Sequence, residues 1–308
     1  MANALPYGAL AKALEGAFRD GVTTPLRSHH TIELPQGTDG AMLVMPAWKA
    51  GRYVAVKMVS IFPDNAKRGL DSVQGIVVLI DATTGQPLAT LDGPEITGRR
   101  TAAASALAAQ YLAREDAQRL LVMGAGTLGA HLARAHAAVR PISKIDVWNR
   151  TPERAARLAA ELRDEGFDAS AVTHPEESMR NADIVTCATM SPEPLVHGAL
   201  LKPGAHVDVV GAYRRDMRET DDDTVRRARI FVDTREGALA EAGDVLLPID
   251  RGVITEQHIL GDLTTLCRGP ATGRTAPTEI TMFKSVGTAV EDWAAAVMAY
   301  EASGASPS

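Results

Sequence analysis

The chain has 308 residues, of which 45% are hydrophobic and 23% charged, an ordinary globular composition at a length that allows two domains. The net charge of −6 and the 4% of aromatic residues argue against a nucleic-acid partner, which calls for basic surfaces and stacking platforms. The N-terminus lacks the pattern of a signal peptide, and no apolar run is long enough to cross a bilayer. The two cysteines, in neither C-x-x-C nor zinc spacing, fit a reducing compartment, so we expect a cytoplasmic protein without membrane contact.

The first third of the chain is expected to form a helix and then an antiparallel sheet. Apolar residues at four-residue spacing predict an amphipathic helix over residues 6–18. Short β-rich runs, separated by Gly, Pro and Asp turns, follow at 42–45, 53–59, 75–80 and 88–91. No helix separates these runs, so we expect a meander with a hairpin turn at 81–86. An Ala-rich helix is predicted over 97–112.

Beyond Arg114 the predicted elements alternate between strand and helix with short connections. Strands are expected at 119–123, 144–148, 182–187, 206–210 and 229–233, and helices at 127–138 and 152–164. Such alternation is typical of a parallel, doubly wound sheet of the α/β class. The acidic run 219–223 is interpreted as the solvated start of a helix, and a last long helix is expected over 283–300.

The strongest local signal is a glycine-rich loop between the predicted strand 119–123 and the helix that follows it. The loop reads Gly124-Ala125-Gly126-Thr127-Leu128-Gly129. This G-x-G-x-x-G pattern stands in the strand–loop–helix context that a dinucleotide site requires. Gly124 allows the tight turn, Gly126 lets the backbone approach a pyrophosphate, and Gly129 allows close packing of the helix, whose N-terminus supplies N–H donors.

The end of the second predicted strand indicates which dinucleotide binds. Sites that prefer NAD place an acidic residue there, and its charge would repel a 2′-phosphate. This chain has the neutral Asn149 followed by Arg150 and Arg154, and guanidinium groups pair well with phosphate oxygens. NADP is therefore the preferred prediction, with NAD as the alternative if Arg150 is only a solvated surface residue. Thr151 belongs to the same segment and also suits the N-cap of the next helix.

Three basic residues of the N-terminal region are candidate substrate ligands. Arg27 precedes the predicted sheet, Lys57 lies inside an apolar strand, and Arg100 falls in the first turn of a helix, where a cation is disfavoured. A small anionic substrate would satisfy all three. The alternative is an edge-strand lysine and two exposed arginines, and periodicity alone favours it.

Metal and thiol chemistry find little support in the sequence. The eight histidines show no ligand spacing, so we predict no metal site. Cys187 ends a predicted strand and is interpreted as a small buried packing residue.

Further stretches combine with the glycine loop into a recognisable pattern. They are 44–47, 56–59, 97–103, 148–151, 202–206, 243–245 and 283–292. Over nearly its whole length the chain resembles the ornithine cyclodeaminase/mu-crystallin family. The resemblance implies a Rossmann-type doubly wound parallel sheet over 114–283. It also implies an α+β substrate-binding and dimerisation domain made of 1–113 with 284–308, through which subunits form a homodimer.

The resemblance also assigns roles to particular residues. Arg27, Lys57 and Arg100 would bind the substrate carboxylate, and Lys57 would also act in catalysis. Gln74 is a further candidate for lining the substrate site. The cofactor site would extend beyond the glycine loop and the 149–154 segment to Thr101, Thr189, Val210 and Gly211.

One position helps to choose among the activities of the family. Cyclodeaminases convert ornithine to proline and ammonia with NAD, and they carry an Asp after a late Rossmann strand. Here Tyr213 takes that position, and a phenol with a pKa near 10 is a poor base at neutral pH. Asp216 is a candidate catalytic replacement if its loop folds back. The alternative is an exposed aspartate beside Arg214 and Arg215.

These observations lead to one expected activity and its alternatives. We expect an NADPH-dependent reductase of a small cyclic imino acid, 1-pyrroline-2-carboxylate or 1-piperideine-2-carboxylate, which gives L-proline or L-pipecolate. Reduction of a preformed imine asks only that the imine be protonated, oriented by its carboxylate and presented to the nicotinamide. The alternatives are an ornithine cyclodeaminase, which is a lyase, an alanine dehydrogenase, and a non-catalytic protein that binds NADPH and a small ligand.

Overall fold

A computed structural model of the protein describes residues 2–269 and 273–304. Contacts within the chain divide it into a split unit, Met1–Arg100 with Thr288–Ser308, and a central unit, Thr101–Gly287. The division falls inside helix α2 (Gly93–Leu112), whereas the sequence places the domain boundary after that helix. Within the described ranges, no helix combines the length and the apolar character that crossing a membrane requires.

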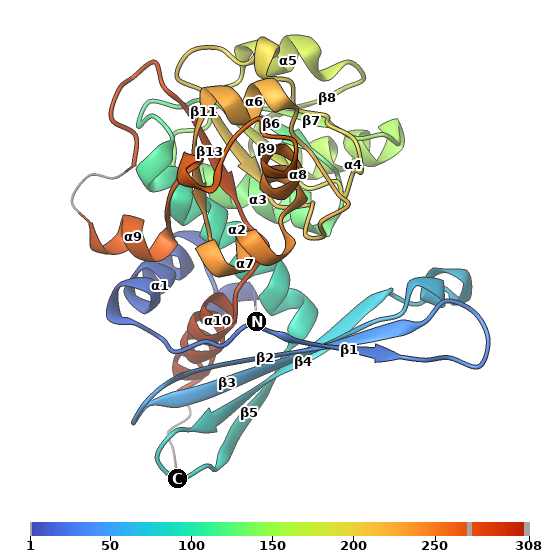
Figure 1. Cartoon of the computed structure of the whole chain (residues 1–308), viewed down its shortest axis with the longest axis vertical. Helices are drawn as coiled ribbons and strands as arrows, with labels where there is room; N and C mark the ends of the chain where they lie inside the picture. The colour runs from blue at the N-terminus through green and yellow to red at the C-terminus, as the bar shows by residue number, and fades with distance from the viewer. Residues whose placement is uncertain (1, 270–272, 305–308) are drawn as a thin grey trace. The chain divides into compact units, whose positions relative to one another are not determined.

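The split unit is built on a five-stranded antiparallel sheet in the order β1-β2-β3-β4-β5, the meander that the sequence predicts (Figure 1). Its strands are β1 (Ser28–Ile32), β2 (Gly40–Lys49), β3 (Tyr53–Ile61), β4 (Val73–Asp81) and β5 (Pro87–Asp92). The predicted hairpin turn at 81–86 is confirmed: Asp81 Oδ1 accepts the N–H groups of Thr83 and Thr84, both at 2.7 Å. Such side-chain acceptors stabilise tight turns.

Helices cover one face of this sheet. Helix α10 (Ala289–Ala302) packs against β2, β3 and β4 and also against α1 (Tyr7–Asp20), which confirms the predicted N-terminal helix. Two short 3₁₀ turns, η1 (Ala2–Ala4) and η2 (Pro63–Arg68), complete the unit. On β3, Ala55 and Lys57 are buried on the side of α10, whereas Val54 and Val56 on the opposite face stay partly exposed. The sheet therefore has one covered face and one open, apolar face.

The central unit contains an eight-stranded sheet in the order β12-β11-β13-β10-β9-β6-β7-β8, and the strand pairs given for it are all parallel. Its strands are β6 (Arg119–Met123), β7 (Lys144–Trp148), β8 (Asp168–Val172), β9 (Ile184–Cys187), β10 (His206–Val209), β11 (Ala228–Val232), β12 (Ile259–Asp262) and β13 (Ile280–Lys284). The predicted doubly wound α/β class is confirmed. The strand order reverses between β6 and β9, and ligands of such sheets bind at that reversal, outside the carboxyl ends of the strands.

Helices occupy the connections of this sheet. They are α3 (Thr127–Ala137), α4 (Pro152–Asp164), α5 (Pro175–Asn181), α6 (Asp222–Arg227), α7 (Arg235–Glu241), α8 (Gly243–Asp250) and α9 (Leu263–Arg268), with 3₁₀ turns η3 (Gly198–Leu200) and η4 (Glu256–His258). The predicted helices at 127–138 and 152–164 correspond to α3 and α4. Pro152 at the first turn of α4 suits a position whose N–H has no helical partner.

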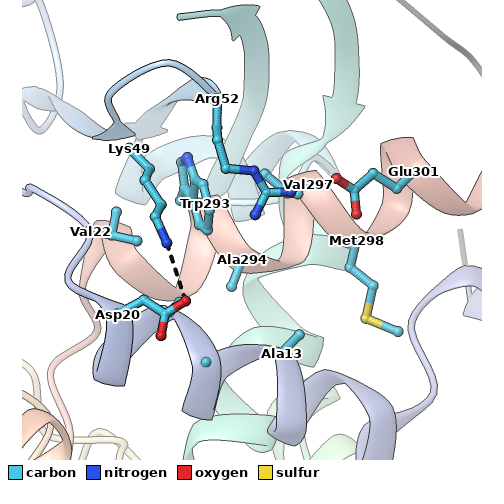
Figure 2. Close-up of a pocket in the computed structure, with 12 residues that line it drawn as sticks. Ala13, Asp20, Val22, Lys49, Arg52, Trp293, Ala294, Val297, Met298 and Glu301 are labelled. Atoms are coloured by element: carbon cyan, nitrogen blue, oxygen red, sulfur yellow. Dashed lines mark hydrogen bonds and ion pairs between the residues drawn. The ribbon is translucent and has the colours of Figure 1, made fainter.

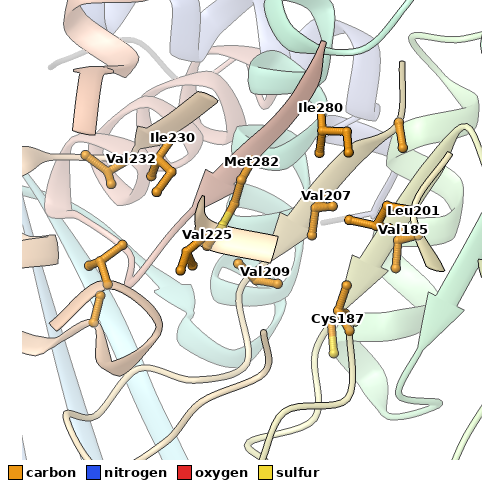
Figure 3. Close-up of a cluster of buried hydrophobic side chains, with 14 of the residues drawn as sticks. Val185, Cys187, Leu201, Val207, Val209, Val225, Ile230, Val232, Ile280 and Met282 are labelled. Carbon is orange, nitrogen blue, oxygen red and sulfur yellow. The ribbon is translucent and has the colours of Figure 1, made fainter. Parts of the chain in front are cut away.

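Both faces of the parallel sheet are buried, as expected for strands covered by helices. One face carries Val185, Val207, Val209 and Met282, which belong to a single apolar cluster (Figure 3). The neighbouring residue Ile184 points to the other face and joins a second cluster with Leu120, Val122, Ile145 and Val147. These two layers fix the strands and thereby the loops at their carboxyl ends.

The predicted helix over 283–300 is wrong at its start. Residues 280–284 form strand β13, which is fully buried between β10 and β11, and helix α10 begins only at Ala289. Gly287, with a φ of 85°, separates the two elements. Phe283 and Lys284 thus belong to the parallel sheet of the central unit, and the predicted domain boundary before Lys284 cuts through a strand.

Candidate active site

The glycine loop lies between β6 and α3, at the carboxyl edge of the sheet. Gly124 has a φ of 108°, and a Cβ there would come within 2.5 Å of the carbonyl oxygen of Ala188. A Cβ on Gly129 would overlap the carbonyl oxygen of Gly124. A Cβ on Gly126, in contrast, would meet nothing within 4 Å. Packing within the protein therefore accounts for the first and third glycines, and the second borders open space that fits an approaching pyrophosphate.

Thr127 and Leu128 form the first turn of α3, directly after this open space. The first N–H groups of a helix have no partner inside the helix, so they can bind an anion. The residues around the loop thus fit the phosphates of a dinucleotide.

Asn149 braces the glycine loop from the end of β7. Its Oδ1 accepts the N–H of Ala125 at 3.0 Å, and its Nδ2 donates to the carbonyl oxygen of Thr151 at 3.0 Å. Both functions of the amide are thus engaged with backbone. The side chains of Arg150 and Arg154 are exposed, and the hydrogen bond of Arg154 to Thr151 O, at 3.1 Å, comes from its backbone N–H. The guanidinium groups therefore remain as the groups that can distinguish a 2′-phosphate.

Thr189, Val210 and Gly211 lie together in the loops that follow β9 and β10. Val210 donates its N–H to Cys187 O at 3.0 Å, and a Cβ on Gly211 would come very close to Thr189 N, so the loops are in direct contact. The carbonyl group of Ala188, in the loop after β9, also lies against Gly124. Thr101, the remaining predicted cofactor ligand, lies buried in α2. These roles at the cofactor remain predictions.

The interpretation of 219–223 as a solvated helix start is wrong for its first two residues, which are fully buried. Glu219 is fully buried, and its carboxylate accepts N–H groups from the loops that follow β9 and β10. Helix α6 begins later, at Asp222, and Asp221 caps it by accepting the N–H of Thr224. The acidic run therefore combines a buried acceptor with a true N-terminal cap.

A buried cluster of four charges lies in the split unit. Lys57 Nζ donates to Asp292 Oδ1 at 2.8 Å, and Arg100 Nε lies 3.0 Å from the same oxygen. Arg100 also donates to Glu291 Oε2. Lys57 and Arg100 are 2% and 4% exposed, so neither is the surface residue of the alternative interpretation. The sequence predicts an anionic partner for these cations, and α10 supplies two carboxylates.

The pKa of Lys57 is lowered from its ordinary value to about 8. Burial is the main cause, and the positive charge of Arg100 acts in the same direction, whereas Asp292 opposes both. An ammonium group carries three N–H donors, and Asp292 takes one of them. Lys57 is therefore a cation that can change its charge near neutral pH.

The structure does not bring Gln74 to this cluster. Lys57 pairs with Val77 across β3 and β4, and Gln74 lies an odd number of residues from Val77. Alternation along a strand therefore places Gln74 on the other face of the sheet, where it is exposed and donates to Asp71 O at 3.3 Å. Arg27 lies half-buried in the segment between α1 and β1.

Asp216 lies on the exposed loop after β10, in an ion pair with Arg214. The Nε and Nη2 groups of Arg214 donate to the two carboxylate oxygens at 2.9 and 2.8 Å. This pairing lowers the pKa of Asp216, so the group stays ionised and is a poor proton donor. This geometry matches the alternative interpretation, in which Asp216 is an exposed aspartate beside Arg214. A catalytic role for Asp216 remains a prediction. Tyr213 is half-buried in the same loop.

Cys187 is fully buried at the end of β9, and burial raises the pKa of its thiol well above the ordinary value. The interpretation as a packing residue is confirmed. Among the described residues, no group of three His, Cys, Asp or Glu side chains is placed to hold a metal ion.

A cavity of about 400 Å³ lies elsewhere in the split unit, among α1, α10 and the ends of β2 and β3. Figure 2 shows Lys49 reaching to Asp20, an ion pair of 3.2 Å, with Trp293 beside them. Arg52 pairs with Glu301 at 3.1 Å at the same opening. None of the predicted site residues lines this cavity, so it is separate from the charge cluster around Lys57.

Comparison with known proteins places this geometry in a family. The model of the ornithine cyclodeaminase/mu-crystallin family matches residues 3–306. A Delta(1)-pyrroline-2-carboxylate reductase of Paracoccus denitrificans is 41% identical over 291 residues, which cover 92% of this chain and 91% of the relative.

Solved structures agree with this match. The structure of a Thermococcus litoralis Delta(1)-pyrroline-2-carboxylate reductase in complex with NADH and L-proline is 38% identical, with a TM-score of 0.89 over 96% of this chain and 92% of the other. An archaeal alanine dehydrogenase dimer with bound NAD is 29% identical, with a TM-score of 0.88 over 96% and 91% of the two chains. The chain therefore belongs to the ornithine cyclodeaminase/mu-crystallin family.

Proposed function

We propose that this chain is an NAD(P)H-dependent reductase of a small cyclic imino acid, with 1-pyrroline-2-carboxylate as substrate and L-proline as product. The observation that carries the proposal is the 38% identity, over nearly the whole chain, to a reductase of that imine bound to NADH and L-proline. The curated reductase of Paracoccus denitrificans supports the same activity. The open space beside Gly126 supports the cofactor.

The central unit is proposed to hold the cofactor. The Gly124–Gly129 loop and the start of α3 would take the pyrophosphate, and Arg150 with Arg154 would take a 2′-phosphate. We propose NADPH as the preferred form, because both functions of Asn149 are engaged with backbone and no carboxylate stands at that position to repel the phosphate. When bound, the reduced nicotinamide supplies a hydride to the imine carbon.

The split unit is proposed to hold the substrate carboxylate. Lys57 and Arg100 are buried cations that share Asp292 Oδ1 as a partner, and burial strengthens their attraction for an anion. The imine nitrogen must gain a proton during reduction, and Lys57, with a pKa of about 8, is the group in the cluster best matched to supply or orient it. Arg27 is proposed as a third contact on the strength of the family resemblance.

A homodimer is proposed as the assembly. The face of the sheet opposite Lys57 carries Val44 and Trp48 on β2, Val56 on β3 and Ile76 and Val78 on β4. Trp48 and Ile76 are 36% and 41% exposed, and the other three are partly exposed. An apolar sheet face of this kind is commonly covered by a partner. The archaeal alanine dehydrogenase relative is described as a dimer, and a second copy of this chain is the proposed partner.

Ornithine cyclodeamination is the alternative activity, and the loop after β10 disfavours it. Tyr213 stands where cyclodeaminases carry an aspartate, and the nearby Asp216 is paired with Arg214 at the surface. A carboxylate held ionised by an arginine cannot readily donate a proton.

A substrate panel tests the proposal. The purified protein would be mixed with NADPH and 1-pyrroline-2-carboxylate, 1-piperideine-2-carboxylate, pyruvate with ammonia, or ornithine. We expect NADPH oxidation with a cyclic imine and formation of the corresponding amino acid. Faster turnover with pyruvate and ammonia would instead make the chain an alanine dehydrogenase. Binding of NADPH without turnover of any substrate would favour a non-catalytic protein.

A further inference from the structure

Glu219 is a buried carboxylate that joins two loops at the carboxyl edge of the parallel sheet. Its Oε1 accepts the N–H and the hydroxyl of Thr189, at 2.6 and 2.7 Å, in the loop after β9. Its Oε2 accepts the N–H groups of Gly211 and Ala212, at 2.8 and 3.1 Å, in the loop after β10. Four donors from two loops thus converge on one side chain that is fully buried.

The backbone of Glu219 is itself held in place by a second layer of buried charge. Asp244 Oδ1 accepts the backbone N–H of Glu219 at 2.8 Å, and Asp244 Oδ2 lies 2.9 Å from Lys284 Nζ. Asp244 and Lys284 are both fully buried. Burial raises the pKa of Glu219, and the positive charge of Lys284 opposes this shift, as a buried carboxylate requires.

The two loops lie on a particular side of the glycine loop. In a doubly wound sheet the pyrophosphate binds at the first strand, here β6, and the two halves of a dinucleotide extend to either side of the strand-order reversal. Asn149 and Arg150 follow β7, on one side of β6, whereas β9 and β10 lie on the other. The loops joined by Glu219 therefore lie on the side opposite the adenosine half, the side of the nicotinamide.

We propose that Glu219 is a positioning residue for the nicotinamide end of the cofactor site, which it shapes by fixing the Thr189 and Gly211 loops to each other. The inference rests on the proposed function in that it takes the cofactor to be a nicotinamide dinucleotide. Glu219 does not touch the reacting atoms and acts through the two backbone segments that it holds.

Replacement by glutamine tests this role because it keeps the shape of the side chain while it changes the charge and the hydrogen bonding. A glutamine offers one acceptor oxygen and one NH₂ group. In Glu219→Gln, the NH₂ group must face the N–H donors of either Thr189 or the Gly211–Ala212 pair, so one loop loses its acceptor. Glu219→Asp is the second variant: it keeps the charge but is one methylene too short to reach both loops.

The measurement compares the whole cofactor with a fragment that lacks nicotinamide. Binding of NADPH and of 2′-phospho-ADP-ribose would be measured by calorimetry for the wild type and both variants, without any substrate. We expect NADPH to bind about tenfold more weakly to each variant while the fragment changes by less than about twofold. Amide hydrogen exchange at Thr189, Gly211 and Ala212 should also become faster in the cofactor-free variants.

Asp183→Asn is the matched control. Asp183 also accepts two backbone N–H groups, those of Gln118 and Arg119 at 2.9 Å, but it does so at the amino edge of the same sheet. This variant should bind NADPH and the fragment like the wild type.

The outcomes separate the inference from the proposed activity. Equal weakening of both ligands in the Glu219 variants, or no weakening of either, would overturn the positioning role. A wild type that binds both ligands but does not reduce the imine would refute the proposed function and leave the role of Glu219 to be decided by the variants. A wild type that does not bind NADPH would overturn both.

Discussion

At the scale of single residues, Arg150 and Arg154 are the proposed contacts of a 2′-phosphate. Asn149 already uses its amide oxygen for Ala125 and its amide nitrogen for Thr151, so it is a brace for the loop.

We predict that the double variant Arg150→Ala, Arg154→Ala weakens NADPH binding by about tenfold or more and leaves NADH binding within about twofold, because charge-assisted bonds to the phosphate are lost. Titration of both cofactors checks this. Arg157→Ala, an exposed arginine further along α4, is the control. An equal loss of affinity for both cofactors would remove the arginines from phosphate recognition.

The charge of Lys57 gives a prediction about pH. Its pKa is lowered to about 8, mainly by burial, so the ammonium form dominates below pH 8 and is lost above it. If that form binds the carboxylate or supplies the proton, kcat/KM for the imine should fall about tenfold per pH unit above pH 8 while NADPH affinity stays constant. Lys57→Met should abolish imine turnover, and Lys49→Met, which removes the lysine that pairs with Asp20, should keep the wild-type profile. A flat profile up to pH 10, or turnover by Lys57→Met, would show that Lys57 has neither role.

At the scale of elements, the glycine loop offers a matched pair of substitutions. A methyl group on Gly126 meets no protein atom within 4 Å, so Gly126→Ala should keep the thermal midpoint and lose cofactor affinity. A methyl group on Gly129 overlaps the carbonyl oxygen of Gly124, so Gly129→Ala should lose stability as well, by about 1–3 kcal/mol. Thermal unfolding and NADPH titration of both variants make the comparison. Wild-type affinity in Gly126→Ala would show that no ligand approaches the loop there.

Elements with a strong periodic or motif signal were predictable from the sequence. The strands at Arg119–Met123 and Lys144–Trp148 and the helix at Pro152–Asp164 have the predicted bounds, because apolar runs and a proline in the first helical turn define them locally. Strand β8, at the edge of the sheet, was missed, since Asp168-Ala169-Ser170-Ala171-Val172 has little β propensity and gains its conformation from pairing with β7.

The partners of charged side chains were harder to predict, because they come from distant parts of the chain. Lys57 meets Asp292 across 235 residues, and the acceptor role of Glu219 depends on loops that only the folded sheet brings together. In the sequence, Glu219 looks like its neighbours in a solvated acidic run. Glu219 precedes α6 by three residues, and no motif in the sequence separates it from Asp221, Asp222 and Asp223.

At the scale of the whole molecule, the open face of the antiparallel sheet predicts self-association. Val56 pairs with Pro46 and Val78 near the middle of this face, so Val56→Glu would place a charge within any interface there. We predict that the wild type is a dimer by light scattering and that Val56→Glu is a monomer, since a buried unpaired carboxylate costs more than the interface can offset. Thr83→Glu, in the exposed turn before β5, should stay dimeric. A dimeric Val56→Glu would place the interface elsewhere.

Reduction of an imine by a nicotinamide cofactor can be followed with a hydrogen isotope, which labels the product. NADPH carrying deuterium at the transferable position of the nicotinamide would be incubated with the protein and 1-pyrroline-2-carboxylate, and the product examined by mass spectrometry and NMR. We expect L-proline with one deuterium at Cα and one NADPH consumed for each proline formed. Proline and ammonia formed from ornithine without net consumption of cofactor, together with no deuterated proline from the imine, would contradict it.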